Sequence, residues 1–478
     1  MSTRDSVLLI TSNGAGMGHL ARQLAVAIAG SEQVDSTILS MSRALPTILG
    51  EGVRGEYAPG PDRDWIPAER WPHYLAARIG ALAREVRAQA VVFDGVAPYR
   101  GITLARRQMR DVPFVWFRRG MWREGVNGSQ LWKGALFDAI IEPGDISRAA
   151  DRGLTASRTD AVRISPVSLV EVVTPLPRHE AARALGLDPA RPAVLMTLGT
   201  GRLGDVATPG ATILDALLEV TDWQIGVVRS SIADMEIPVH DHARIFPVKG
   251  VFPLARYLSA FDAAVSAAGY NSVHELIPSR LPTLLIPNLS TRTDDQRARA
   301  REAERLGVAL VAEPGSPREL KDGVEAMADA PTRDRILQAI AALPDSVLTG
   351  GAAQTATRLL DLATSFQPSA LSPRERMAEW RDDGKESLKR FLGPGGTNRV
   401  RRALGRPTAA AGERVRVTVG EVERLDPTTR SLRFMESPGV ADLEGPDPVE
   451  HIVAGASGPY RSARELIAGD FFEIVSPG

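Results

Sequence analysis

One stretch, residues 261–310, restricts the possible fold more than any other part of the chain. It reads FDAAVSAAGYNSVHELIPSRLPTLLIPNLSTRTDDQRARAREAERLGVAL. An apolar run leads into a glycine turn and a short helix, and a second apolar run ends at Pro287, before a polar loop and a charged helix. Continuous short apolar runs are typical of strands that are buried on both faces. The stretch therefore predicts part of a parallel sheet covered by helices.

Strand and helix patterns alternate twice along the chain. The first series predicts strands at 7–10, 37–41, 90–93, 114–117, 137–141 and 162–164, with helices after the first strand and at 73–87 and 100–109. The second series starts near residue 193 and adds helices at 211–220, 253–260, 316–327 and 351–363. Such alternation predicts α/β architecture with two doubly wound, Rossmann-like domains. We place them at 1–170 and 171–366, with a hinge at Pro175 to Pro177.

The sequence changes character after Phe366. Residues 367–412 contain a charged helix followed by a basic linker rich in proline, glycine and alanine. Residues 413–478 include a period-two pattern around the turn DPTT, which predicts a β-hairpin, and a short terminal strand in DFFEIVSPG. We therefore expect a small β-rich appendage at 413–478.

Composition excludes several classes of protein. The 478 residues include no cysteine, which rules out disulfides, thiolate nucleophiles and cysteine-ligated metals. The formal net charge of −1 gives no reason to expect nucleic acid as a partner. No apolar run approaches the roughly 20 residues that a membrane span needs, and the histidines lack metal-ligand spacing. We expect a cytoplasmic protein with no metal and no cofactor.

Polar side chains follow the strands of the 261–310 stretch. Helix-opening amides after Gly269 suit a phosphate, because the first amides of a helix lack internal partners. Glu275 and the run from Asp294 to Gln296 would lie at the rim where the carboxyl ends of parallel strands meet. Such acceptors suit the hydroxyls of a ribose or a hexose.

A second candidate lies near the start of the chain, where Gly14, Gly16 and Gly18 precede His19. Glycines at this spacing let the backbone turn tightly and approach a ligand closely. The spacing differs from the dinucleotide-binding fingerprint, because the third glycine comes too early. His19 at the mouth of a helix is therefore the residue of interest in this loop.

These features together resemble the GT-B glycosyltransferases, in which two Rossmann-like domains face each other across a cleft. The most similar branch contains the lipid-linked N-acetylglucosaminyltransferase of peptidoglycan synthesis and related nucleotide-sugar enzymes. The resemblance covers about residues 5–365 and is strongest in SAAGYNSVHELIPSRLPTLLIP and in DDQRARA with LGVAL. One departure is that Ala267 and Ala268 stand where the peptidoglycan enzyme usually carries an arginine.

The resemblance implies an inverting, metal-independent transfer of a hexose-type sugar from a nucleoside-diphosphate donor, most often a UDP-sugar, to a hydroxyl-bearing acceptor. It implies that His19 is the general base and that Asp94 orients it, while Glu275 binds the ribose. The other donor-side residues would be Gly199, Gly201, Phe252, Gly269, Asn271, Ser272, Asp295 and Gln296, and the acceptor-side residues would be Gly16, Gly18 and Arg119.

Several alternatives stay open at the level of sequence. His19 and Asp94 also suit a helix start and a helix cap, and Glu275 also suits the first turns of any helix. The same fold serves UDP-sugar 2-epimerases, and a non-catalytic nucleotide-sugar-binding protein would share the donor residues. Arg119, between aromatic residues and other arginines, favours either a salt-bridged loop or peripheral contact with the inner face of a membrane.

Overall fold

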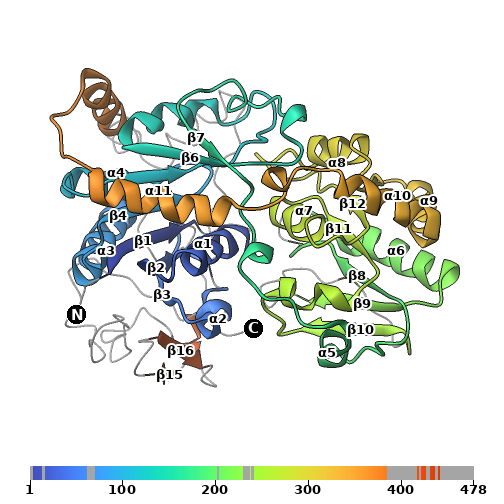
Figure 1. Ribbon diagram of the computed structural model, residues 1–478. Helices are drawn as coiled ribbons and strands as arrows, with labels where there is room; N and C mark the ends of the chain where they lie inside the picture. Colours follow the sequence, from blue (N-terminus) through green and yellow to red (C-terminus); the bar gives the residue numbers. More distant parts are fainter. Residues whose placement is uncertain are drawn as a thin grey trace.

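A computed structural model describes residues 4–12, 17–42, 44–61, 70–201, 204–229, 237 and 242–384, together with the strand segments 417–418, 421–426, 431–435 and 440–441. Two parallel sheets, each flanked by helices, lie side by side (Figure 1). Gly16, which we predicted on the acceptor side, and the predicted terminal strand fall outside the described residues.

The first sheet has the strand order β3-β2-β1-β4-β5-β6-β7. Its strands are β1 (Asp5–Thr11), β2 (Val34–Ser40), β3 (Arg54–Tyr57), β4 (Ala90–Asp94), β5 (Phe114–Phe117), β6 (Ala139–Pro143) and β7 (Val162–Ile164). The chain passes outward from β1 to β3 and then returns to add β4 on the other side of β1. The gap between the carboxyl ends of β1 and β4 is therefore a topological switch point, where such sheets bind ligands.

Helices cover both faces of the first sheet because its strands alternate two sets of apolar side chains. Val7 and Leu9 pack towards α1 (Gly18–Ala29), whereas Leu8 and Ile10 pack towards α3 (Trp71–Val86) and α4 (Arg100–Gln108). A short helix, α2 (Leu45–Ile48), precedes β3. The sequence patterns did not reveal α2 or β3, since both are short and lack a clear period.

The second sheet has the order β10-β9-β8-β11-β12-β13, with its switch point between β8 and β11. Its strands are β8 (Ala193–Thr197), β9 (Gln224–Arg229), β10 (Ile245–Lys249), β11 (Ala263–Ala267), β12 (Thr283–Ile286) and β13 (Leu310–Val311). Its helices are α5 (Arg178–Ala184), α6 (Ala207–Val220), α7 (Tyr270–Leu276), α8 (Gln296–Arg305), α9 (Pro317–Ala328) and α10 (Ala330–Ala341). The predicted helix at 253–260 is the 3₁₀ helix η5 (Leu254–Ala260).

The helix α11 (Gly351–Ser365) follows the second sheet in sequence but packs on the first. Ala352 and Leu359 lie in the same apolar cluster as Leu20 and Leu24 of α1, and α11 runs beside α1 in Figure 1. The sequence grouped this helix with residues 171–366. Its amphipathic pattern predicts a buried face but not which sheet that face covers.

We call the part of the molecule built around the first sheet the first half, and the part built around the second sheet the second half. The charged segment after α11 also packs on the first half. Residues 373–384 are helical. The buried carboxylate of Asp382 accepts hydrogen bonds from Arg100 Nη1 and Thr103 Oγ1 of α4, each at 2.8 Å. Further along, β15 (Glu421–Asp426) and β16 (Ser431–Met435) form the predicted antiparallel hairpin, and β14 (Val417–Thr418) pairs with β17 (Val440–Ala441).

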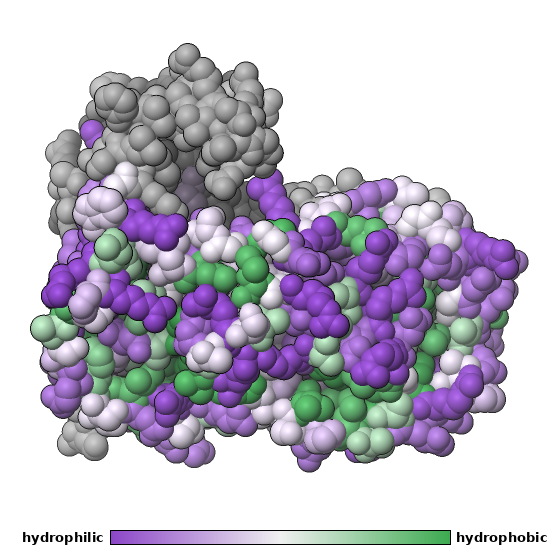
Figure 2. Space-filling model, turned by 90° about the horizontal axis from the view of Figure 1, so that it is seen from above, coloured by the Kyte–Doolittle hydropathy of each residue, from purple (hydrophilic) through white to green (hydrophobic). Residues whose placement is uncertain are grey.

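Hydrophilic and hydrophobic residues are interspersed over the face of the molecule in Figure 2. Among the described residues, no helix combines the length and the apolar character that crossing a membrane requires.

The close packing of α11 on the first half generates a stability prediction. A Cβ atom on Gly351 would overlap the carbonyl oxygens of Ser165 and Pro166, which are backbone atoms and cannot rotate away. Gly351→Ala should therefore lower the free energy of unfolding by about 1–3 kcal/mol. The matched control is Gly315→Ala, which meets no atom within 4 Å and should stay within about 0.5 kcal/mol of wild type in chemical denaturation. Equal stability of the two variants would contradict the packing.

Candidate active site between the two halves

His19 and Asp94 meet at the switch point of the first sheet. His19 lies in the first turn of α1, the helix that follows β1 in the chain. Asp94 is the last residue of β4. Nδ1 of His19 is 2.6 Å from Oδ1 of Asp94. Because a carboxylate only accepts hydrogen bonds, Nδ1 carries the proton and Nε2 keeps its lone pair. The pair thus has the geometry of a base with its orienting carboxylate.

The charges around the pair keep Asp94 ionised and His19 neutral. Burial alone would raise the pKa of Asp94, but Arg22 and His19 outweigh it and hold that pKa far below its ordinary value. Burial, assisted by the cations of Arg22 and Arg119, lowers the pKa of His19 from 6.5, and Asp94 only partly opposes this shift. A neutral imidazole at pH 7 is able to take up a proton.

Two further residues of α1 complete the hydrogen bonds of Asp94. Arg22 donates to its two oxygens from Nε and Nη2, at 3.1 and 2.9 Å, and Gln23 donates from Nε2 at 3.2 Å. Arg22 and Gln23 are fully buried. Sequence reasoning missed both, although their spacing of three and four residues from His19 places them one helical turn away.

The helix α7 of the second half packs against this network. Asn271 donates from Nδ2 to the carbonyl oxygen of Gly18 at 3.3 Å and accepts from Arg22 Nη1 at 3.1 Å. The ring of Tyr270 lies near two guanidinium groups, with the Cζ atoms of Arg22 and Arg119 at 5.3 and 5.6 Å from its centroid. Two predicted site residues, Gly18 and Asn271, are therefore joined across the halves.

Glu275 lies one turn after Asn271, so the two side chains share a face of α7. Its carboxyl group is partly buried, and burial alone raises its pKa to about 7. Neither a hydrogen bond nor an ion pair to another described residue holds this carboxyl group in place. Ser272, three residues before Glu275, is also partly exposed. Both side chains are free to meet a ligand.

The loop before α8 lies against the first half. Arg299 of α8 pairs with Asp294 at 2.8 Å and with Asp145 of the first half at 2.9 Å. Arg119 lies 3.5 Å from the same Asp294, whose pKa falls to about 2 because Arg299 and Arg119 outweigh the effect of burial. Arg119 therefore reaches from the first half to the second and shares the Asp294 carboxylate with Arg299.

Asp295 and Gln296 have structural contacts at the start of α8. The Asp295 side chain caps the helix by accepting from the Ala298 amide at 3.0 Å. Oε1 of Gln296 accepts from the Asn288 amide at 3.0 Å, and its Nε2 lies close to Gly269, the N-cap of α7. Gln296 thus lies beside the predicted phosphate turn, whereas one oxygen of Asp295 is already occupied.

His274 connects the halves and is not part of the His19–Asp94 pair. Its Nδ1 donates to the Tyr270 carbonyl oxygen at 2.7 Å, and its Nε2 accepts from the Ile146 amide at 3.1 Å. Burial lowers its pKa, which keeps the ring neutral as these two bonds require. The sequence carried no signal for this contact, because residues 146 and 274 belong to different halves.

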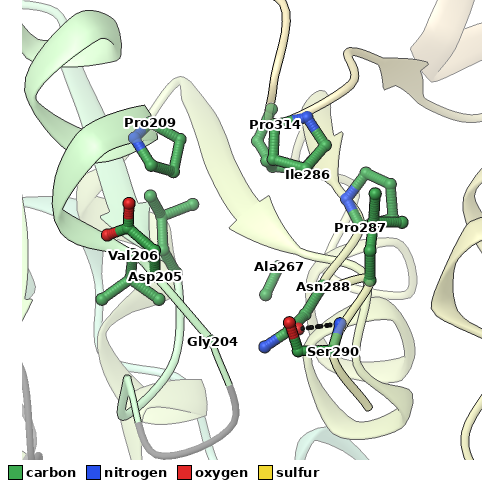
Figure 3. A pocket seen from close by; sticks show the side chains of 12 residues that line it. Gly204, Asp205, Val206, Pro209, Ala267, Ile286, Pro287, Asn288, Ser290 and Pro314 are labelled. Carbon is green, nitrogen blue, oxygen red and sulfur yellow. Dashed lines mark hydrogen bonds between the residues drawn. The ribbon is translucent and has the colours of Figure 1, made fainter.

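A hollow opens at the carboxyl ends of β8, β11 and β12 (Figure 3). It holds about 450 Å³, including the part open to solvent. Of its twelve lining residues, Asp205 alone is charged, and that carboxylate caps α6. The lining residues are Leu198, Gly204, Asp205, Val206, Pro209, Ala267, Ile286, Pro287, Asn288, Leu289, Ser290 and Pro314. Such a lining suits an uncharged group.

The remaining predicted residues lie around this hollow or at the seam between the halves. Gly199 and Gly201, in the loop after β8, have φ angles of +93° and +72°, which glycine adopts without strain. Phe252 is partly buried against the apolar cluster of the first sheet, so its ring packs at the seam. A place for Phe252 beside a nucleotide base stays a prediction. Within the described ranges, no three His, Asp or Glu side chains converge as a metal site.

Comparison with known proteins agrees with this architecture. Residues 244–341 match the glycosyltransferase family 28 C-terminal domain, a segment that includes α7, β12 and α8. Over 137 residues the chain is 34% identical to the UDP-N-acetylglucosamine–N-acetylmuramyl-(pentapeptide) pyrophosphoryl-undecaprenol N-acetylglucosamine transferase of Salinibacter ruber (strain DSM 13855 / M31). That match covers 27% of this chain and 36% of the relative, so it spans about a third of the relative's length.

Solved structures show the same fold over most of the chain. The spinosyn forosaminyltransferase SpnP aligns with a TM-score of 0.53 at 16% identity, and the glycosyltransferase VinC in complex with dTDP aligns with a TM-score of 0.50 at 18% identity. Each alignment covers 76% of this chain and 100% of the other. The predicted GT-B fold is confirmed, as is the resemblance to the branch that contains the peptidoglycan enzyme.

The raised pKa of Glu275 predicts a pH-dependent stability. Its ordinary value is 4.5 and its folded value is about 7, so between these pH values the folded protein keeps a proton that the unfolded chain has released. This group therefore makes the fold less stable as pH rises through that window. Relative to wild type, the free energy of unfolding of Glu275→Gln should rise by about 1–2 kcal/mol as the pH goes from 4.5 to 7.5. This value already includes a reduction for solvent screening.

Urea denaturation at a series of pH values measures this difference. Glu325→Gln, on the exposed side of α9, is the matched control and should follow wild type at every pH. A constant offset between Glu275→Gln and wild type across the series would show that Glu275 titrates in the folded protein as it does in the unfolded chain.

Proposed function

We propose that this protein is an inverting, metal-independent glycosyltransferase that moves a hexose-type sugar from a nucleoside-diphosphate donor to a hydroxyl acceptor. The observation that carries the proposal is the contact between the His19–Asp94 pair of the first half and α7 of the second half. A base from one sheet and a ligand-facing helix from the other meet where both sheets have their switch points.

In this mechanism His19 activates the acceptor. Its Nε2 takes the hydroxyl proton while the acceptor oxygen attacks the anomeric carbon, and the bond from that carbon to the diphosphate oxygen breaks on the opposite side. One displacement inverts the configuration at the anomeric carbon. Asp94 fixes the tautomer of His19 and stabilises the imidazolium that forms.

The donor would lie along α7 and the adjacent loops. Glu275 would accept hydrogen bonds from the ribose hydroxyls, and Ser272 with the amides after Gly269 would meet the diphosphate. Arg22 and Arg119, both close to the ring of Tyr270, would balance the charge of the departing diphosphate in place of a metal ion. Gln296, Asp295 and the loop with Gly199 and Gly201 would face the sugar.

The nucleobase of the donor is proposed from the ligands that the names of the relatives give. The Salinibacter ruber enzyme is named for UDP-N-acetylglucosamine, and VinC was solved with dTDP. Both contain a pyrimidine nucleoside diphosphate, and we propose a UDP-sugar as donor with a dTDP-sugar as the alternative. The hollow near Ala267 and Asn288, in which Asp205 is the one charged lining residue, suits a neutral part of such a donor.

Replacing the general base should slow sugar transfer strongly and leave donor binding in place. His19→Gln should lower kcat by about 100-fold to 10,000-fold, since it cannot accept the proton. In wild type, kcat/KM should fall as pH drops through the pKa of His19, which lies below 6.5. Release of nucleoside diphosphate, with a panel of hydroxyl acceptors, measures both effects. His179→Gln, at an exposed site on α5, is the matched control.

Full activity of His19→Gln would contradict the assignment of the base. Epimerised sugar formed from the donor alone, with no acceptor present, would contradict the transferase proposal and favour the 2-epimerase reaction.

Donor binding is tested separately by thermal shift with UDP-, dTDP- and GDP-sugars. A UDP-sugar should raise the Tm of wild type, because a ligand that binds only the folded state stabilises it by mass action. Glu275→Ala should lose most of this shift, and Glu325→Ala should retain it. No shift with any donor, or equal shifts in wild type and Glu275→Ala, would overturn the proposed donor site.

A further inference from the structure

Arg22 belongs to the first half but contacts both halves. Its side chain is 1% exposed, and every one of its guanidinium nitrogens has a partner. Nε and Nη2 bind the two oxygens of Asp94, while Nη1 donates to Asn271 Oδ1 of α7. Nη2 also lies 2.8 Å from Nδ1 of His19. The guanidinium plane is thus fixed by the proton-transfer pair on one side and by α7 on the other.

The contacts from α7 depend on the docking of the two halves. Asn271 holds Nη1 of Arg22 and the carbonyl oxygen of Gly18 with the same amide group, and the ring of Tyr270 lies 5.3 Å from the guanidinium carbon. Tyr270 is itself held by the Val167 amide, which donates to its hydroxyl at 3.0 Å. If the halves separate, Arg22 loses these contacts but keeps Asp94 within reach.

We propose that Arg22 is a positioning residue that couples the docking of α7 to the alignment of the His19–Asp94 pair. The inference rests on the proposed function in that it takes His19 as the base. Two donors from one rigid group hold the carboxylate in plane, and α7 holds that group. The docking of the donor-binding half therefore contributes to the alignment of the base.

The same coupling controls the charge of His19. The charged groups that face it are Asp94 from β4, Arg22 from α1 and Arg119 after β5, while α7 presents the uncharged Tyr270 and Asn271. Burial is the largest cause of the lowered pKa of His19, and the Arg22 cation adds to it. Separation of the halves admits water and frees Arg22, so the pKa of His19 should rise towards its ordinary value.

The test is a pH titration of the histidine carbon Cε1 resonances by NMR, on the full chain with labelled histidine. The chain has seven histidines, and the spectrum of His19→Gln assigns the resonance of His19. The variant that decides is Asn271→Ala, which removes the contact across the halves and leaves all groups on Asp94 intact. Arg22→Gln removes the cation itself. Thr293→Val, which removes the hydrogen bond from Asn127 Nδ2 across another part of the seam, is the matched control.

We expect His19 to titrate below pH 6.5 in wild type and in Thr293→Val, and at higher pH in both Asn271→Ala and Arg22→Gln. An unchanged titration in Asn271→Ala overturns the proposal, whatever Arg22→Gln does. The titration needs no substrate, so its outcome is separate from any failure to find transferase activity. Should Arg22→Gln fail to fold, Asn271→Ala alone gives the answer, with its fold checked by thermal unfolding.

Discussion

The docking of α7 against the first half is the interaction on which the candidate site depends. Three residues of α7 hold it in place: the Tyr270 hydroxyl accepts from the Val167 amide, the Asn271 side-chain amide binds both Gly18 and Arg22, and the His274 ring accepts from the Ile146 amide. Each of these contacts joins α7 of the second half to a residue of the first half. Without them, the two switch points would be separate ligand sites on separate domains, and His19 would have no partner surface for a donor.

Buried charged residues explain why the two halves dock in one arrangement. Asp94, Asp145 and Asp294 each pair with an arginine in the seam, and Arg299 is completely buried between two of them. Buried ion pairs add little net stability, because desolvation offsets the attraction, but the loss of one partner leaves an uncompensated buried charge. The network therefore favours one docked arrangement over others. Among the described residues, Arg119 has one ion pair, which is 3.5 Å long, so its guanidinium group can turn towards an anionic ligand without breaking a close contact.

The sequence predicted the architecture well, because buried parallel strands appear as short apolar runs and their helices as amphipathic patterns. It also predicted His19, Asp94 and Glu275 as candidate residues, and the structure brings His19 and Asp94 into contact. It could not predict Arg22, Tyr270 or His274 as contacts across the seam, since no local pattern marks a pairing between residues more than 100 positions apart. For the same reason the packing of α11 on the first sheet was missed.

The most direct measurement is a crystal structure of the protein with a nucleoside diphosphate and a hydroxyl-bearing acceptor. We expect the ribose within hydrogen-bond distance of the Glu275 carboxylate and the diphosphate between Arg119 and the start of α7. We also expect the acceptor hydroxyl within hydrogen-bond distance of Nε2 of His19. A nucleotide bound away from α7, or an acceptor held far from His19, would contradict the proposed site.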